Sequence, residues 1–287
     1  MSGGHDPSSV DAGAARPPGW SSQPLPRSPA RAVKALLRSV FRDPRTNEKL
    51  LLFFAAQVRE TLTARLLRAH GRILGGLFEG LAIPAHVSHR NLAFAQVMGS
   101  YESFLQAVIA EVAPRHDRFV DIGCACGFYT NGVAKRFGLP AVGVELDAEQ
   151  VPLADAIAAA NGLTDVRHVH ERPGYDLLTY LQDGALHLVD IEGGEWELVE
   201  RVRPETLRRA GFLVELHEAG GRSIADLQAA FEARFGATHE VRWVREAFPE
   251  DEVLGRLQAL GVPRTVGLMA LAESRGIYQI WADIRPR

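Results

Sequence analysis

Cysteine is scarce in this chain, which has only two among its 287 residues, Cys124 and Cys126. Their spacing is unsuited to an ordinary structural disulfide, and no second Cys or His pair stands nearby to complete a zinc site. A reducing compartment fits such a chain best. Because the N-terminus also lacks a charged segment followed by an apolar one, we expect no secretory signal and a cytoplasmic protein.

Excess positive charge is also absent, because 32 Lys and Arg are outweighed by 35 Asp and Glu, which leaves a formal net charge of −3. No global basic field therefore argues for nucleic acid as a partner. No stretch is apolar over the length that a transmembrane helix needs, so we expect no membrane partner either. The residues present, 46% hydrophobic and 23% charged, suffice for a substantial core in an ordinary globular protein.

The part of the chain ahead of residue 98 divides into two segments. Residues 1–29 are rich in Gly, Pro, Ser and Ala and have almost no large apolar groups, so we expect a disordered tail. Residues 30–97 begin with apolar side chains at helical spacing as far as about Ala82, which predicts a region of two or three helices. Breaks stand before Pro44 and before Pro84.

This helical region allows two interpretations. The plainer one is packing or homodimerisation through its helices, and the sharper one is a lid over a substrate pocket. Its aromatic side chains suit either, and the sequence does not choose between them; they are Phe53, Phe54 and Phe78.

Residues 98–287 alternate between helices and short apolar strands. Repeated βα units with buried strands form a parallel sheet that helices cover on both faces. Two late strands would close it with an antiparallel edge, which predicts an α/β fold: a doubly wound, Rossmann-like, mostly parallel seven-stranded sheet. We expect strands at 118–122, 141–145, 166–169, 186–191, 211–216, 239–244 and 277–284, and helices at 103–112, 130–136, 149–161, 175–182, 196–207 and 251–260.

A loop of small residues follows the first of these strands. Gly123, Ala125 and Gly127 would let the backbone approach a ligand closely at the carboxyl end of the strand. A dinucleotide fingerprint needs a further glycine where Phe128 stands, so a pyrophosphate cradle is disfavoured. Taken alone, the loop could equally be a plain tight turn.

Glu145 closes the next strand, at the distance expected for an acidic residue that accepts both hydroxyls of a ribose. A carboxylate at a strand end could instead be solvated or cap the following helix. The loop and Glu145 together favour a site for a nucleoside.

The loop followed by Glu145 resembles the first two motifs of class I S-adenosylmethionine-dependent methyltransferases. Another segment, ahead of the first strand, resembles the Gly-x-Tyr-Glu motif of related members. Two later segments resemble the Asp-x-Glu-Gly-x-Glu and Glu-x-His motifs of the FkbM-type branch. One departure is Ala125, which replaces a frequent glycine by another small residue. The matching segments are 98–102, 121–127, 188–196 and 212–217.

The resemblance implies S-adenosylmethionine as the cofactor. Asp121 and the loop would hold its methionine part, and Tyr101 would close over it. Glu145 would take the ribose, with Leu146 against the adenine. The cofactor-binding residues expected on this basis are Tyr101, Asp121, Gly123, Cys124, Ala125, Gly127, Phe128, Glu145, Leu146, His170, Glu171 and Asp190. Of these, His170 and Glu171 have the plainer alternative of being surface polar residues, and Cys124 that of small filler.

Two pairs of ionisable residues stand at the ends of the fourth and fifth strands. Asp190 and Glu192 form one pair, and Glu215 and His217 form the other. Alternate residues share a face of a strand, so neighbouring strands would bring all four groups together. We expect His217 to be a general base, because imidazole titrates near neutral pH, and Asp190 to orient the sulfonium side or the acceptor. The alternative is that Glu215 and His217 have structural partners only.

The same four groups could bind a divalent cation through oxygen ligands and an imidazole. We do not favour a metal, because no Asp-Asn pair follows the fifth strand.

The function expected is therefore methyl transfer, to oxygen on a small molecule, sugar or natural-product scaffold; the sequence does not itself decide between oxygen and nitrogen. A nucleotide-dependent oxidoreductase is the alternative on the same architecture, and Phe128 argues against it. A non-catalytic protein with a relict cofactor pocket is another, and the intact set of four ionisable groups argues against that.

Overall fold

The computed structural model describes residues 44–87, 92–245, 250–271 and 279–287. The chain divides into two compact units, residues 1–51 and 52–287, and the sheet and the site belong to the second. The tail expected at 1–29 and the first part of the expected helical region lie outside the described residues.

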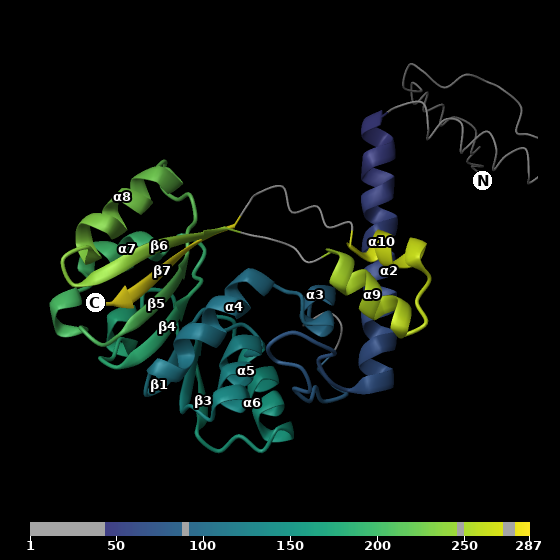
Figure 1. The fold of residues 1–287 in the computed structure, drawn as a ribbon, viewed down its shortest axis with the longest axis horizontal. Helices are drawn as coiled ribbons and strands as arrows, with labels where there is room; N and C mark the ends of the chain where they lie inside the picture. Colours follow the sequence, from purple (N-terminus) through teal and green to yellow (C-terminus); the bar gives the residue numbers. More distant parts are fainter. Residues whose placement is uncertain (1–43, 88–91, 246–249, 272–278) are drawn as a thin grey trace, which may run out of the picture. The chain divides into compact units, whose positions relative to one another are not determined.

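Seven strands form one sheet in the order β3-β2-β1-β4-β5-β7-β6, and β7 runs antiparallel to both of its neighbours (Figure 1). The other pairs are parallel. Every residue of β4 and β5 is buried, as strands covered on both faces require. The expected fold class is confirmed. The strands are β1 Arg118–Ile122, β2 Ala141–Glu145, β3 Val166–His170, β4 Ala185–Val189, β5 Gly211–Glu215, β6 His239–Arg245 and β7 Ile280–Pro286.

Helices cover both faces of the sheet. The described helices are α2 Pro44–His70, α3 Phe94–Met98, α4 Ser103–Val112, α5 Phe128–Phe137, α6 Gln150–Ala160, α7 Glu195–Arg201, α8 Ile224–Phe235, α9 Glu250–Ala259 and α10 Arg264–Leu271. Phe119 of β1 belongs to a core shared with α4, α5 and α6, and the next residue, Val120, to a second core shared with α7 and α8. Successive strand residues point to opposite faces, so one strand serves two cores.

Several helices differ from the expectation. The helix α8 between β5 and β6 was not expected, although Ser223 and Asp226 form a capping box at its start. The single helix expected at 196–207 ends at Arg201, and Pro204 begins a separate 3-10 turn. A proline lacks the amide that a continuing helix needs, which accounts for the break.

The helical pattern expected as far as Ala82 ends at His70. The chain then turns, with Gly71, Gly76 and Gly80 in left-handed conformations that favour glycine. The apolar spacing there reflects burial of a loop, not a helix face. Phe78 lies in the core, with its ring centroid 5.3 Å from that of Phe128.

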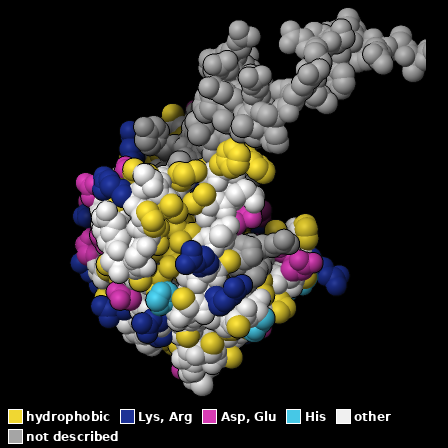
Figure 2. All heavy atoms as spheres, turned by 90° about the vertical axis from the view of Figure 1, so that its right-hand side faces the viewer, with side chains coloured by type: hydrophobic (Ala, Val, Ile, Leu, Met, Phe, Trp, Pro, Cys, Tyr) yellow, Lys and Arg dark blue, Asp and Glu magenta, His cyan; other side chains and the backbone are white. Residues whose placement is uncertain are grey.

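Phe53 and Phe54 have a different environment from Phe78, because their exposed fractions are 59% and 54%. Figure 2 shows hydrophobic side chains gathered on one face of the protein. Large exposed apolar residues of α10 are Leu268 and Met269. Homodimerisation through the N-terminal helices stays a prediction. None of the described helices is long and apolar enough to cross a membrane.

Candidate functional site

A cavity of about 430 Å³ opens at the carboxyl ends of β1, β2 and β4. This edge is where open parallel sheets with helices on both faces bind their ligands. Its lining residues come from the loop after β1, the end of β2, the segment after β3, and the segment that leads from β4 into α7. The lining residues are Gly123, Ala125, Val144, Glu145, Leu146, Gly174, Tyr175, Leu177, Asp190, Ile191, Glu192, Gly194 and Glu197.

Gly123 sets the shape of the cavity at the end of β1. Its φ is +89°, and a Cβ at this position would lie 1.8 Å from the backbone oxygen of Asp190. The loops after β1 and β4 therefore touch at a point where only glycine fits. Ala125 follows in the same loop with φ +44°, a left-handed conformation that glycine adopts at lower cost.

Glu145 is held by backbone amides at the end of β2. Its Oε2 accepts a hydrogen bond from the amide of Ala125 at 2.7 Å, and its Oε1 accepts from those of Leu146 and Asp147, both at 2.8 Å. A carboxylate offers about four lone-pair sites, so roughly one remains on Oε2. One further donor can be accepted in this arrangement, whereas a ribose that donates both hydroxyls would have to displace an amide.

Five of the residues expected to bind the cofactor line the cavity. They are Gly123, Ala125, Glu145, Leu146 and Asp190.

Asp121 lies behind the cavity wall and is not among its lining residues. Its Oδ2 accepts a hydrogen bond from the hydroxyl of Thr130 at 2.6 Å. Burial raises the pKa of Asp121 to about 7, since a carboxylate loses its hydration there. Direct contact between this carboxyl and a ligand in the cavity would require a change of side-chain conformation.

The expected aromatic and cysteine residues also lie behind the wall. Tyr101 and Phe128 pack edge to face in the core, with centroids 6.0 Å apart. Cys124 and Cys126 are buried thiols, and burial raises the pKa of Cys126 to about 11. Such thiols are small packing residues and poor nucleophiles. Gly127 is the N-cap of α5.

His170 ends β3 and Glu171 follows it, and neither is part of the cavity lining. A ring nitrogen of His170 lies 3.2 Å from the backbone oxygen of Leu146, and Glu171 accepts a hydrogen bond from the hydroxyl of Tyr180 at 2.5 Å. These contacts account for both side chains. Tyr175 stands in the lining instead, and the sequence analysis did not select it.

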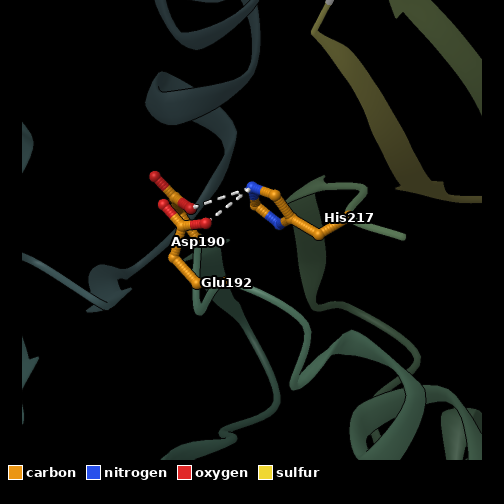
Figure 3. A group of neighbouring side chains, drawn as sticks. All are labelled: Asp190, Glu192 and His217. Carbon is orange, nitrogen blue, oxygen red and sulfur yellow. Dashed lines mark ion pairs between the residues drawn. The ribbon is translucent and has the colours of Figure 1, made fainter. Parts of the chain in front are cut away.

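Four acidic side chains surround His217, at the ends of two neighbouring strands and the start of α7. Nε2 of the imidazole lies 3.6 Å from Glu192, 3.7 Å from Glu215 and 3.9 Å from Asp190. Figure 3 shows Asp190 and Glu192 side by side, both facing the same ring nitrogen. Glu195 lies on the other side, with Oε1 3.0 Å from Nδ1. The four residues expected to converge after β4 and β5 therefore do lie together; they are Asp190, Glu192, Glu215 and His217.

The charges of this cluster perturb one another. The hydrogen bond with Glu195 raises the pKa of His217 to about 9. Burial and, as a smaller cause, the charge of Asp190 raise the pKa of Glu215 to about 8. Burial also raises the pKa of Asp190 to about 6. Near neutral pH the imidazole is thus mainly cationic, and Glu215 holds a proton.

Glu195 belongs to this cluster but was not among the site residues expected from the sequence. It is the last acidic residue of the Asp-x-Glu-Gly-x-Glu motif, so the motif itself was an available signal. Its side chain is fully buried, at 0% exposure. Sequence spacing alone does not show that the first turn of α7 brings it against His217.

Asp190, Glu192 and His217 could also offer a cation three ligand atoms, which lie within 4.8 Å of one another. Glu192 holds its side chain there from a left-handed backbone, with φ +51°. The Glu192 side chain is 86% exposed, so the alternative interpretation is an ordinary solvated surface carboxylate that binds no metal.

No family model and no curated protein matches this chain. Among solved structures, the N-terminal domain of human METTL16 in complex with SAH is similar, with TM-score 0.46 and 17% identity over 79% of this chain and 80% of that chain. A TehB-like SAM-dependent methyltransferase from Corynebacterium glutamicum gives 0.40 and 15% over 63% and 86%. A SAM-dependent methyltransferase from Thiobacillus denitrificans, in complex with S-adenosyl-L-homocysteine, gives 0.40 and 16% over 64% and 91%. At these identities the likeness is one of fold alone.

Proposed function

We propose that this chain is an S-adenosylmethionine-dependent methyltransferase that uses the cavity at the ends of β1, β2 and β4. The observation that carries the proposal is one cavity with two unlike ends. Glu145 and the backbone of the loop after β1 form one end, and Asp190 and Glu192 stand at the other. The first end suits a nucleoside, and the second suits a positive charge.

Electrostatics favours a sulfonium cofactor over a dinucleotide. Asp190 and Glu192 line the cavity. Carboxylates at such short range repel a pyrophosphate and attract a cation. Asp190 Oδ1 is buried and has no hydrogen-bond partner among the described residues, so its negative charge is poorly compensated and would favour a cation nearby. The oxidoreductase alternative is disfavoured for this reason as well as by Phe128.

S-adenosylmethionine, when bound, supplies a methyl group activated by a positively charged sulfur. The protein's own part is to bind, to orient and to move a proton. Glu145 would accept a ribose hydroxyl, and Asp190 would face the sulfonium. His217 would take the proton of the acceptor at Nε2. Because the pKa of His217 is about 9, its free-base fraction, and with it the rate, would increase as the pH rises towards 9.

We assign the acceptor to the class of hydroxyl-bearing small molecules, sugars and natural-product scaffolds, and the chain to the FkbM-type branch. The support is the presence of a general base beside the cavity, which the deprotonation of a hydroxyl group requires. A cytoplasmic location accords with two buried cysteine thiols.

Calorimetric titration tests the proposal. The wild-type chain should bind S-adenosylhomocysteine at one site per chain, and NADH should give no saturable heat. Incubation with S-adenosylmethionine and a panel of phenols, sugars and amines should yield a singly methylated product, read by mass spectrometry. Binding of NADH without binding of S-adenosylhomocysteine would overturn the proposal. Binding without transfer to any acceptor would favour a non-catalytic protein.

A further inference from the structure

Glu195 is the most deeply buried acidic group of the charge cluster. It begins α7, and its side chain has no exposed surface. Its Oε1 faces Nδ1 of His217 at 3.0 Å and also accepts the amide of Gly193 at 3.3 Å. Its Oε2 has no hydrogen-bond partner in the part of the chain that the structure describes. Burying a carboxylate this poorly solvated is costly, so its contact with the imidazole has to offset that cost.

The two nitrogens of His217 have different surroundings. Nδ1 has the contact with Glu195, whereas Nε2 lies 3.6 Å or more from Asp190, Glu192 and Glu215. Distances of that length are beyond a hydrogen bond. The ring is thus held from one side, by Glu195, and its other nitrogen faces two side chains of the cavity wall, Asp190 and Glu192.

A carboxylate can only accept a hydrogen bond, so Nδ1 must carry the proton in the contact with Glu195. In neutral imidazole only one nitrogen carries a proton, which leaves the lone pair on Nε2. Gly193 has φ +108°, so the backbone turns sharply between the end of β4 and the start of α7. This turn allows Glu195 to reach His217.

We propose that Glu195 is a positioning residue that fixes the orientation and the tautomer of His217, so that the Nε2 lone pair faces the cavity. This inference rests on the proposed function in so far as it gives the lone pair an acceptor to deprotonate. A purely structural ion pair between α7 and the end of β5 is the competing explanation. It predicts lost stability on substitution but no control over which nitrogen carries the proton.

Nitrogen-15 NMR of the histidine rings tests the positioning directly, with the His217 signal assigned by its absence in His217→Ala. In the wild type, neutral His217 should carry its proton on Nδ1. In Glu195→Gln, whose amide can also donate, a substantial share of the ring should carry it on Nε2, and the ring should titrate at lower pH. The matched control is Glu200→Gln, an exposed residue of the same helix whose partner is Arg222.

Methyl transfer supplies the second arm, measured on an acceptor found with the panel described above. Glu195→Gln should lower kcat by about 10²- to 10⁴-fold, as the loss of a correctly held base does. Its KM and its affinity for S-adenosylhomocysteine should stay within a few-fold. The double variant Glu195→Ala/His217→Ala should be no slower than His217→Ala, because Glu195 acts only through the imidazole.

An unchanged tautomer in a folded Glu195→Gln variant would overturn the inference, as would losses in kcat that multiply in the double variant. Where Glu195→Ala does not fold, Glu195→Gln and Glu195→Asp carry the NMR arm alone. That arm needs no cofactor, so it decides the role of Glu195 even when the chain binds no S-adenosylhomocysteine. The failure of the proposed function would be read separately, by calorimetry.

Discussion

The two ends of the cavity are built in opposite ways. At the nucleoside end, Glu145 accepts three backbone amides, so its carboxylate is almost saturated before any ligand arrives. At the charged end, Asp190 and Glu195 each keep a buried oxygen with no hydrogen-bond partner among the described residues. The backbone preorganises one end, whereas the other end contains buried carboxylate oxygens whose lack of hydrogen bonds is energetically unfavourable. We therefore expect nucleoside binding at the Glu145 end and proton transfer at the charged end.

The largest effect should come from the charged end. His217→Ala should reduce methyl transfer by about 10²- to 10⁴-fold, because it removes the base. Its affinity for S-adenosylhomocysteine should stay within a few-fold, because His217 is not part of the cavity lining. Steady-state kinetics and calorimetry measure the two quantities. Normal turnover would assign the proton to another group, and rescue by Mg²⁺ or Mn²⁺ would favour a cation held by Asp190 and Glu192.

The next effect should appear where the two ends meet. Gly123→Ala places a Cβ 1.8 Å from the backbone oxygen of Asp190, so the loops after β1 and β4 must separate. We expect a loss of about 2–4 kcal/mol in the free energy of unfolding and a clear loss of ligand affinity. Gly138→Ala is the matched control, because Gly138 has φ +69° but nothing within 4 Å of the added Cβ. Equal destabilisation of the two variants would show that the loops do not need this close contact.

Glu215, at the charged end, should make the stability of the protein depend on pH. The pKa of Glu215 is raised from 4.5 to about 8, so the folded chain holds a proton that the unfolded chain releases. Glu215 thus favours folding below about pH 4.5, and this contribution is lost as the pH rises to 8. Glu215→Gln cannot ionise there, so its melting temperature relative to that of the wild type should increase across this window. Parallel melting curves from pH 4.5 to 8 would contradict the burial of a titrating Glu215.

The smallest effect should come from Ala125, in the loop after β1. Ala125 has φ +44°, and Ala125→Gly relieves that conformation while it increases the entropy of the unfolded chain. The two contributions oppose each other, so the free energy of unfolding should change by less than about 1 kcal/mol. Affinity for S-adenosylhomocysteine should stay within a few-fold. A large loss of affinity would show that the alanine methyl group itself contacts the ligand.

The sequence predicts the nucleoside end better than the charged end, for a physical reason. Gly123 and Glu145 each directly follow or end a buried strand, and neighbouring parallel strands bring such positions together. The same rule places Asp190 near His217. The rule does not predict the place of Glu195, because that depends on the turn at Gly193 and on how the first turn of α7 packs.

Helices outside the βα repeat were predicted less well. The apolar residues between Gly71 and Ala82 have the spacing of a helix, but the segment is a buried loop that contains three left-handed glycines. The opposite error concerns α8, for which Ser223 and Asp226 supplied a usable start signal. Apolar periodicity reports that a face is buried, and only capping and breaking residues report whether the backbone is helical.

Titration of S-adenosylhomocysteine into the wild type and into Glu145→Ala tests whether the cavity holds the nucleoside of S-adenosylmethionine. A lost hydrogen bond to a carboxylate is worth about 1.5–3 kcal/mol, so the variant should bind about ten- to a hundredfold more weakly. Circular dichroism should show that it stays folded without the amide contacts of Glu145. Unchanged affinity in a folded Glu145→Ala variant would contradict the claim.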